Sequence, residues 1–129
     1  MDKQVYLICP VRNCPPEVGA KIKAYVTKIE SEGKIVHYPP RDVDQAQGGL
    51  EICSQHRSAM VMCHEIHVWW DNKSTGSHFD LGMAFMLSQY KGTHLEFVLA
   101  NPEDVPATIS KSFGNVIRRL SLRRDCVRS

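Results

Sequence analysis

One stretch decides the fold, the uninterrupted apolar run Val5-Tyr6-Leu7-Ile8-Cys9 near the amino end of the chain. Five apolar residues without a polar position between them are typical of a strand that is buried on both faces. Such strands occur in parallel sheets, because the crossover helices that connect parallel strands cover both sides of the sheet. The run therefore predicts a doubly covered strand of a parallel sheet.

Outward from this run, short apolar segments alternate with amphipathic ones. Helices are predicted from residue 18 to Gly33, over residues 50–62, from Ser77 to Gly92 and over residues 105–122, and further strands over residues 34–38, 65–70 and 93–99. Residues 10–16, 39–49 and 71–76 are predicted loops. Strands and helices that alternate in this way form crossover units. The predicted fold class is α/β, a three-layer sandwich with a doubly wound, flavodoxin-like parallel sheet of four or five strands.

The same spacing predicts which side chains face the core. In the helix that begins at Ser77, one side carries Phe79, Met83, Met86, Leu87 and Tyr90. In the last helix, the inward residues are Ile109, Phe113, Val116, Ile117 and Leu120. Trp69 and Trp70 are neighbours in a strand and so point to opposite faces. We expect one of them in the core and the other stacked on a base or in a subunit interface.

Composition indicates one globular domain. The chain has 129 residues, of which 43% are apolar and 23% are charged, and its formal net charge is +2. The near-balanced charge disfavours a nucleic-acid partner. No apolar run approaches the ~20 residues of a membrane helix, and the first residues lack a signal-peptide pattern. With an odd number of cysteines, five, these features predict a cytoplasmic domain over residues 1–129, without a membrane partner.

Basic residues gather near the carboxyl end, and a basic tail is expected from about residue 118. The cations of this region face a single acid, Asp125, and are Lys111, Arg118, Arg119, Arg123, Arg124 and Arg128. One interpretation is a solvated helix whose cations lie near the negative end of its dipole. The other is a surface that binds phosphates or RNA. The sequence favours the solvated helix.

The segment richest in chemical groups leaves the predicted strand 65–70, forms a polar loop and enters the next helix. Backbone N–H groups there, with the hydroxyls of Ser74, Thr75 and Ser77, suit a phosphate or a sugar hydroxyl. Asp80 lies one turn into the helix at the same rim. The alternative is purely structural, because Ser77 and Asp80 also have the spacing of a capping box.

Three segments carry a family resemblance: residues 6–13 (Tyr-Leu-Ile-Cys-Pro-Val-Arg-Asn), 37–42 (His-Tyr-Pro-Pro-Arg-Asp) and 74–84 (Ser-Thr-Gly-Ser-His-Phe-Asp-Leu-Gly-Met-Ala). Together they resemble the nucleoside 2-deoxyribosyltransferase family, which includes related deoxynucleoside 5′-monophosphate N-glycosidases. The resemblance covers residues 4–100, and the third segment is the most specific. It implies a domain of this type, with covalent catalysis in two steps as in retaining glycosidases.

The resemblance implies three catalytic residues. Asp80 matches the acidic residue that attacks the anomeric carbon of the sugar, although the family usually has Glu there, one methylene longer. Tyr6 resembles the tyrosine that orients this carboxylate. His56 stands in the place of a family aspartate, and an imidazole is suited to deliver a proton to the leaving base. The alternative for His56 is a helix histidine without a catalytic role, and Asp71 is a second candidate proton donor.

Further residues are implied to bind the substrate: Arg12, Arg41, Asp42, Asp44, Asp71, Ser74, Gly76 and Ser77. Arg12 resembles the first-loop arginine of the monophosphate-cleaving branch, and Ser74 falls on the serine that contacts phosphate in that branch. Arg41, Asp42 and Asp44 lie in the loop that is expected to meet the base or the sugar.

The resulting prediction is an enzyme that cleaves or transfers the N-glycosidic bond of 2-deoxyribonucleosides or their 5′-monophosphates. The family implies no cofactor and a homo-oligomer, a dimer or higher, whose subunits complete one another's sites. The apolar helix from Ser77 to Tyr90 suits a two-fold interface. The alternative is a non-catalytic nucleotide-binding module that kept the pocket and lost the chemistry.

No metal is predicted. The spacing of Cys53, His56, Cys63, His64 and His67 fits no standard zinc pattern, and His67 is expected in the middle of a strand. Cys9 ends an apolar strand, so packing in the core is its expected role.

Overall fold

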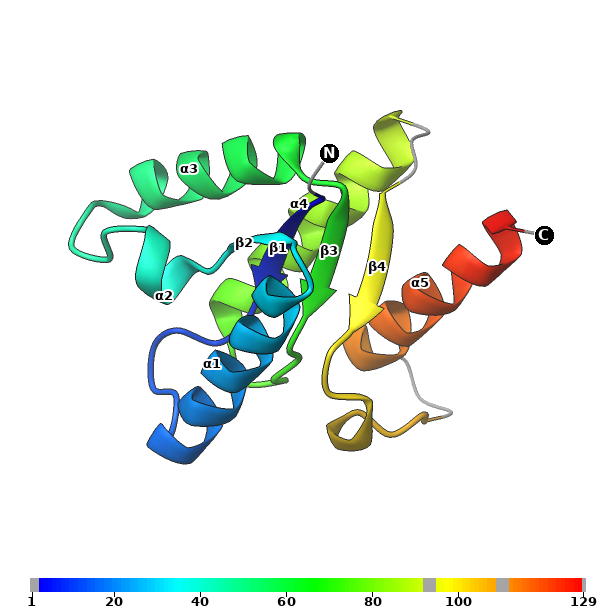
Figure 1. Cartoon of the computed structure of the whole chain (residues 1–129), viewed down its shortest axis with the longest axis horizontal. Coiled ribbons are helices and arrows are strands. Elements are labelled where there is room, and N and C mark those ends of the chain that lie inside the picture. Colours follow the sequence, from blue (N-terminus) through cyan, green and yellow to red (C-terminus); the bar gives the residue numbers. More distant parts are fainter. Residues whose placement is uncertain (1–2, 92–94, 109–111, 129) are drawn as a thin grey trace.

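Four parallel strands form one sheet within the residues that the computed structural model describes, 3–91, 95–108 and 112–128. The strands are β1 (Gln4–Ile8), β2 (Ile35–His37), β3 (Glu65–Val68) and β4 (Glu96–Leu99), in the spatial order β2-β1-β3-β4 (Figure 1). The apolar run therefore supplies an inner strand, as predicted. The chain winds in one direction from β1 to β2 and in the other from β3 to β4, so ligands are expected near the carboxyl ends of β1 and β3.

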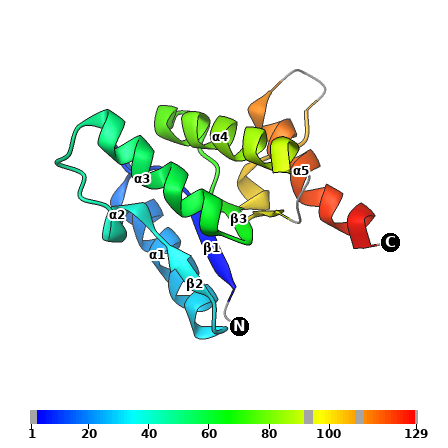
Figure 2. The same ribbon diagram turned by 90° about the horizontal axis from the view of Figure 1, so that it is seen from above.

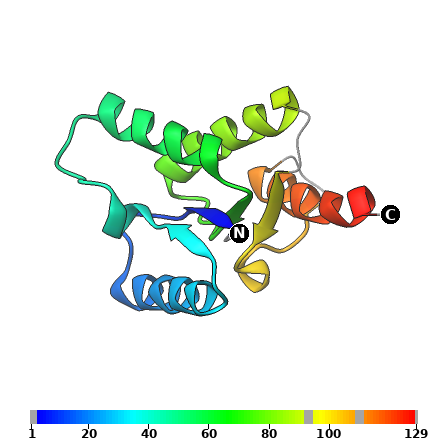
Figure 3. The ribbon, with the colours of Figure 1, turned by 45° about the horizontal axis from the view of Figure 1, so that its top comes forward.

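Helices cover both faces of this sheet, which confirms the doubly wound fold class. Helix α1 (Pro16–Ser31) lies on one side, and α3 (Gly49–Met62) and α4 (Thr75–Lys91) lie on the other (Figure 2, Figure 3). Helix α5 (Phe113–Arg128) packs on the same side as α3 and α4, against β4. Two single turns complete the order of elements: α2 (Pro39–Asp42) and the 3₁₀ turn η1 (Pro102–Asp104).

The core has two halves because side chains alternate across each strand. On β1, Tyr6 faces α3 and α4 while Leu7 faces α1, and both are fully buried. Trp69 and Trp70 are divided between the two halves in the same way, as predicted. Both are nevertheless buried, so the expectation that one of them stacks on a base or fills an interface is wrong.

The predicted start of one helix and the extent of one loop are corrected in the segments that follow β3 and β2. Helix α4 begins at Thr75 rather than Ser77, because the Ser74 hydroxyl accepts a hydrogen bond from the Ser77 N–H at 3.2 Å and caps the helix. The region 39–49, predicted as a loop, contains the helical turn α2. Pro39 and Pro40 favour that turn, since their fixed φ suits a first helical turn and their missing N–H groups cost nothing there.

The last helix begins later than predicted. It starts at Phe113 instead of residue 105, because Pro106 cannot lie inside a helix and Val105 packs into the core. Ile117 and Leu120 are buried, as predicted, whereas Phe113 and Val116 are exposed. They lie one residue away from the buried stripe, so their predicted inward orientation is wrong. The predicted inward residue Ile109 lies outside the described residues.

Helix α4 buries only part of the side that was predicted, since Met83 and Leu87 pack against the core while the other three residues do not. Leu81 and Ala84 are its buried core residues. Phe79, Met86 and Tyr90 are 56%, 62% and 83% exposed, so their predicted core position is wrong. The reason is rotational: Leu81 and Ala84 set the side of the helix that faces the core, and Phe79, Met86 and Tyr90 lie on the opposite side.

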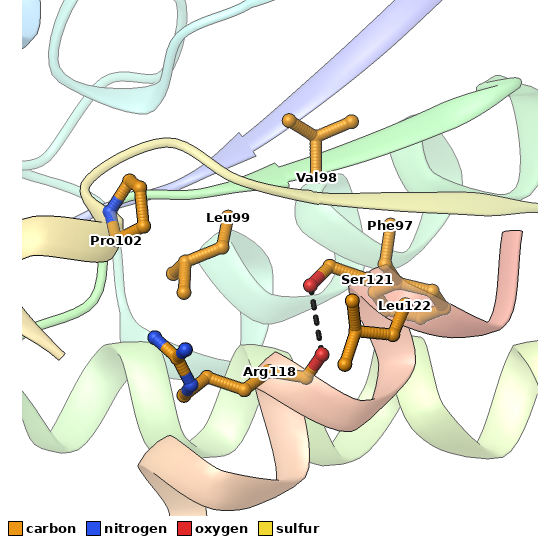
Figure 4. Close-up of a pocket in the computed structure, with 7 residues that line it drawn as sticks. All are labelled: Phe97, Val98, Leu99, Pro102, Arg118, Ser121 and Leu122. Atoms are coloured by element: carbon orange, nitrogen blue, oxygen red, sulfur yellow. Dashed lines mark hydrogen bonds between the residues drawn. The ribbon is translucent and has the colours of Figure 1, made fainter. Parts of the chain in front are cut away.

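At the other edge of the sheet, a cavity of about 340 Å³ lies between β4 and α5 (Figure 4). Arg118, at its rim, donates from Nη1 to the Val105 carbonyl at 2.8 Å, so this member of the predicted basic tail stabilises the fold. Lys111 and the side chains of Arg123, Arg124 and Arg128 lie outside what the structure describes. In the described part of the chain, no helix has both the length and the apolar character to cross a membrane.

Candidate active site

Asp80 lies in the second turn of α4, and its carboxylate is held by side chains from two other elements. The Tyr6 hydroxyl, on β1, donates to Asp80 Oδ2 at 3.1 Å. His56 Nδ1, on α3, lies 3.3 Å from Asp80 Oδ1. The Asp80 side chain is 10% exposed. Since Ser74 provides the helix cap, the structural interpretation of Asp80 as part of a capping box is wrong.

A second histidine, His37, completes this cluster at the end of β2. Its ring stacks on the Tyr6 ring, with 5.1 Å between centroids and 17° between planes. It also meets the His56 ring edge-on, with a centroid separation of 6.3 Å. The parallel register that pairs Tyr6 with His37 creates this contact. Sequence reasoning missed His37 as a site residue, although His37 opens the segment 37–42, which carries part of the family resemblance.

Burial and charge fix the protonation of Tyr6 and His37. Burial raises the pKa of Tyr6 well above its usual range, and the negative charge of Asp80 raises it further, so Tyr6 remains a hydroxyl donor. Burial lowers the pKa of His37; Asp42 and Asp80 oppose that shift, whereas His56 and Arg41 add to it. His37 is therefore uncharged at neutral pH.

Two ring nitrogens of the cluster are unpaired. Nε2 of His37 and Nε2 of His56 are buried and have no hydrogen-bond partner within the described residues. Most buried polar atoms in proteins are hydrogen-bonded, so such atoms call for an explanation. Because the Asp80 carboxylate accepts the Nδ1–H of His56, the unpaired Nε2 is the atom of this ring that is left for proton transfer.

In the half of the core on the α1 side, burial also keeps Cys9 protonated. Burial, followed by the charges of Cys14 and Asp80, raises the pKa of the Cys9 thiol to about 12. Cys9 is thus a buried thiol at the end of the apolar run, as predicted, and not a nucleophile.

The loop before α4 places its hydroxyls close together. The Ser74 hydroxyl donates to the Ser77 hydroxyl at 2.9 Å, and Ser77 is buried. Gly76 is exposed in the first helical turn. Asp71 Oδ1 accepts the Lys73 N–H at 2.9 Å, which tightens the loop. Gly76 and Ser77 therefore lie in the first turn of the helix that carries Asp80, and Ser74 caps that turn.

The predicted substrate-binding residues after β2 make hydrogen bonds within the fold. Arg41 donates to Asp42 at 2.8 Å and to the Val36 carbonyl at 3.0 Å, and it pairs with Glu30 at 3.1 Å. Hydrogen bonds to Asp42 and Glu30 raise the pKa of Arg41 above its ordinary value. Asp44 Oδ1 accepts the Ala46 N–H at 3.0 Å.

Arg12, from the loop after β1, is exposed and makes no hydrogen bond or ion pair with other described residues. Its neighbour Asn13 has a φ of 57°, in the left-handed region that asparagine tolerates well. A free guanidinium in this loop is available to an anionic ligand.

The residues weighed for a zinc site are dispersed. His64 Nδ1 accepts the Gln4 N–H, and His67 bonds to Tyr25 and Glu65 on the α1 side of the sheet, opposite His56. Across residues 3–91, 95–108 and 112–128, no group of three or more metal-ligating side chains is arranged to hold an ion.

Comparisons with known proteins agree with this fold. No protein-family model and no curated protein sequence matches the chain. A 2-desoxiribosyltransferase from Leishmania mexicana superposes with a TM-score of 0.54 at 17% identity, over 87% of this chain and 80% of that one. The CMP N-glycosidase BcmB from Clostridium botulinum gives 0.50 at 14% identity, over 94% and 99%. The resemblance seen in the sequence is thus confirmed at the level of the fold, which this chain shares with enzymes of glycosidic-bond chemistry.

Proposed function

We propose that the protein cleaves or transfers the N-glycosidic bond of 2-deoxyribonucleosides or their 5′-monophosphates. One observation carries the proposal: the carboxylate of Asp80 is held between the Tyr6 hydroxyl and His56 Nδ1. A carboxylate oriented by one donor and placed beside an imidazole suits nucleophilic attack coupled to proton transfer. The names of the two structural neighbours, a deoxyribosyltransferase and a CMP N-glycosidase, support a nucleoside or nucleotide substrate.

In the first step, an Asp80 oxygen attacks the anomeric carbon C1′ of the sugar. The C1′–N bond breaks and its electron pair goes to the base nitrogen, which takes a proton from His56 Nε2. Tyr6 holds Oδ2 as a neutral hydroxyl, so it orients the carboxylate without adding charge. When the ester forms, Asp80 loses the negative charge that stabilises a protonated His56 ring. Transfer of the sugar to Asp80 and release of the proton from His56 Nε2 therefore favour each other.

In the second step, water or an acceptor base attacks C1′ and displaces the Asp80 carboxylate. His56 Nε2 accepts the proton that the attacking water loses, which restores the starting state. The free base and the free sugar, or the exchanged nucleoside, are the products. Asp71, in the loop before α4, is the second candidate for the acid that protonates the leaving base.

Substrate binding is proposed for the loops around this cluster. Arg12, which has no bond to other described residues, is the proposed ligand of a 5′-phosphate, together with Ser74, Gly76 and Ser77 at the amino end of α4. The base and sugar are assigned to the segment after β2 that contains Arg41, Asp42 and Asp44.

A second candidate function is a non-catalytic nucleotide-binding module. It is favoured by the short Asp80 side chain, both of whose oxygens are hydrogen-bonded while only 10% of the side chain is exposed. Calorimetry separates the two candidates, because a module binds deoxynucleoside monophosphates without releasing free base.

We also propose a homo-oligomer, a dimer or higher, that associates through α4. Its outward residues Phe79, Met86 and Tyr90 form an exposed apolar stripe on a helix whose other side is buried. Sedimentation of the wild type should give a mass above that of one chain, and Met86→Glu should reduce it. A monomeric wild type at micromolar concentration contradicts the proposal.

The proposed reaction is tested by incubating the protein with each 2-deoxyribonucleoside and each 5′-monophosphate, with and without an acceptor base. Chromatography of the free base should show turnover of at least one substrate. Glu103→Gln, at an exposed acid on η1, is a control that should behave as the wild type. If the folded protein releases no base from any of these substrates, the proposed reaction is refuted.

A further inference from the structure

His37 contacts both side chains that hold Asp80. It stacks face to face on Tyr6, the donor to Oδ2, and it packs edge-on against His56, the partner of Oδ1. Tyr6 and His56 also meet each other, with ring centroids 5.8 Å apart and planes at 70°. The three rings therefore form a closed set of contacts, in which each ring limits the rotation of the other two.

The charges that face His37 come from every neighbouring element. Asp42 and Arg41 face it from α2, His56 from α3 and Asp80 from α4, while β1 contributes the neutral Tyr6. Asp42 and Arg41 are bonded to each other, so their charges largely cancel. His37 thus packs against its neighbours as an uncharged ring, and it adds no competing cation beside Asp80.

No hydrogen bond joins His37 to Asp80, so His37 can orient the carboxylate only through Tyr6 and His56. Aromatic pairs at such separations are stabilised by about 0.5–1.5 kcal/mol beyond the area that they bury. This is enough to favour one ring orientation over its alternatives. A displacement of about 1 Å at a reacting group can cost about a hundredfold in rate, so small rotations of these rings matter for catalysis.

We propose that His37 is a positioning residue, whose neutral ring fixes the planes of Tyr6 and His56 so that both keep their hydrogen bonds to Asp80. The expected effect of His37 on turnover rests on the proposed function. The expected effect of His37 on the hydrogen bonds of Tyr6 and His56 is independent of any reaction.

The test compares His37→Ala, which removes the ring, with His37→Phe, which keeps a stacking ring but no nitrogen. The control is His64→Ala, at an exposed histidine outside the cluster. With a substrate that the wild type turns over, His37→Ala should lower kcat about 10- to 100-fold and change KM less than about threefold. His37→Phe should recover most of the lost kcat.

The hydrogen bonds are read directly from the nitrogen-15 and proton resonances of the histidine side chains. In the wild type and in His37→Phe, His56 Nδ1–H should show one hydrogen-bonded resonance that Asp80→Asn shifts. In His37→Ala this resonance should broaden or move towards its position in Asp80→Asn. Circular dichroism of each variant checks that the fold is retained.

Three kinetic outcomes overturn the proposal. They are a kcat of His37→Ala within twofold of the wild type, a loss in His37→Phe as large as that in His37→Ala, and a change in KM alone, which would mark His37 as a substrate contact. If the wild type turns over nothing, the proposed function fails, but the resonance test still decides the role of His37. An unchanged His56 resonance in a folded His37→Ala protein then refutes the positioning role.

Discussion

Two clusters of tyrosine, histidine and carboxylate lie on opposite faces of the same sheet, and they differ in how completely their polar atoms are paired. On the α3–α4 face, Tyr6 and His56 bind Asp80, with His37 stacked beside them. We call this the Asp80 cluster. Two of its ring nitrogens, on His37 and His56, have no partner in the described part of the chain.

The cluster on the α1 face, which we call the Glu65 cluster, is fully connected. The Tyr25 hydroxyl lies 2.6 Å from His67 Nδ1, and His67 Nε2 lies 2.7 Å from Glu65 Oε1. Lys34 adds an ion pair to Glu65 at 3.0 Å. Both nitrogens of the buried imidazole are thus occupied, and the carboxylate has a cationic partner.

The difference agrees with our proposal that the Asp80 cluster serves the reaction, whereas the Glu65 cluster stabilises the fold. A satisfied buried network stabilises one arrangement and has no atom left to react. The Asp80 cluster keeps an unpaired imidazole nitrogen beside a carboxylate that no lysine or arginine of the described residues neutralises. Mutations in the two clusters should therefore affect different measurements, activity in one and stability in the other.

The largest effect is expected at Asp80. Asp80→Ala should lower kcat at least about a thousandfold, because it removes the proposed nucleophile. Asp80→Glu should retain activity or exceed the wild type, since it restores the longer carboxylate of the resembled family. The measurement is release of free base by each purified variant. Wild-type turnover by Asp80→Ala would contradict the assignment.

Next in size is the effect of breaking the Glu65 cluster. Glu65→Ala should reduce the free energy of unfolding by about 3–5 kcal/mol, because it leaves His67 and Lys34 without their buried partner. Urea denaturation measures this loss. The specific activity of the folded fraction should stay within about twofold of the wild type. A large loss of activity without a loss of stability would contradict a structural role for the Glu65 cluster.

The tyrosines provide a matched pair of smaller changes. Tyr6→Phe removes the donor to Asp80 Oδ2 and should lower kcat about 10- to 100-fold. Tyr25→Phe removes the bond to His67 and should cost about 1 kcal/mol of stability, with kcat nearly unchanged. Steady-state kinetics and urea unfolding of both variants test the pair. Equal kinetic losses in the two variants would show that the clusters are not functionally distinct.

The smallest effect is the acid dependence of the Glu65 cluster. Burial opposes the ionisation of Glu65, but hydrogen bonds from His67 and Lys34 outweigh burial and lower its pKa below the ordinary value of 4.5. The resulting stability is complete above about pH 4.5 and is lost as the pH falls through the lower pKa of the folded state. Comparing the unfolding of wild type and Glu65→Gln from pH 7 to 3 should show a stability difference that shrinks in acid. A difference that grows in acid contradicts this sign.

Much of the fold could be read from the sequence because it depends on local patterns. The apolar run of residues 5–9 predicted an inner parallel strand, and helical spacing located α1, α3 and α4. Where the predicted burial of a side chain was wrong, a distant contact had decided the outcome. Phe113 is exposed because Ile117 and Leu120 set the phase of α5 against β4, and Trp69 and Trp70 are both buried because helices cover both faces.

The candidate site was partly accessible in the same way. Asp80, Tyr6 and His56 stood out through the family resemblance, and the structure brings all three together. His37 did not stand out, because its contact with Tyr6 depends on the register between β1 and β2. The sequence does not state that register, since it arises from the packing of two strands that are about thirty residues apart.

The alternation of strands and helices follows from the sequence alone, because hydrophobic periodicity acts over a few neighbouring residues. The sequence also placed a carboxylate in the first turns of the helix after β3. That this carboxylate bonds to a tyrosine and a histidine instead of capping its helix is a result of long-range packing. That choice depends on side chains 74 and 24 positions away, which the sheet register and the packing of α3 against α4 bring within hydrogen-bond distance.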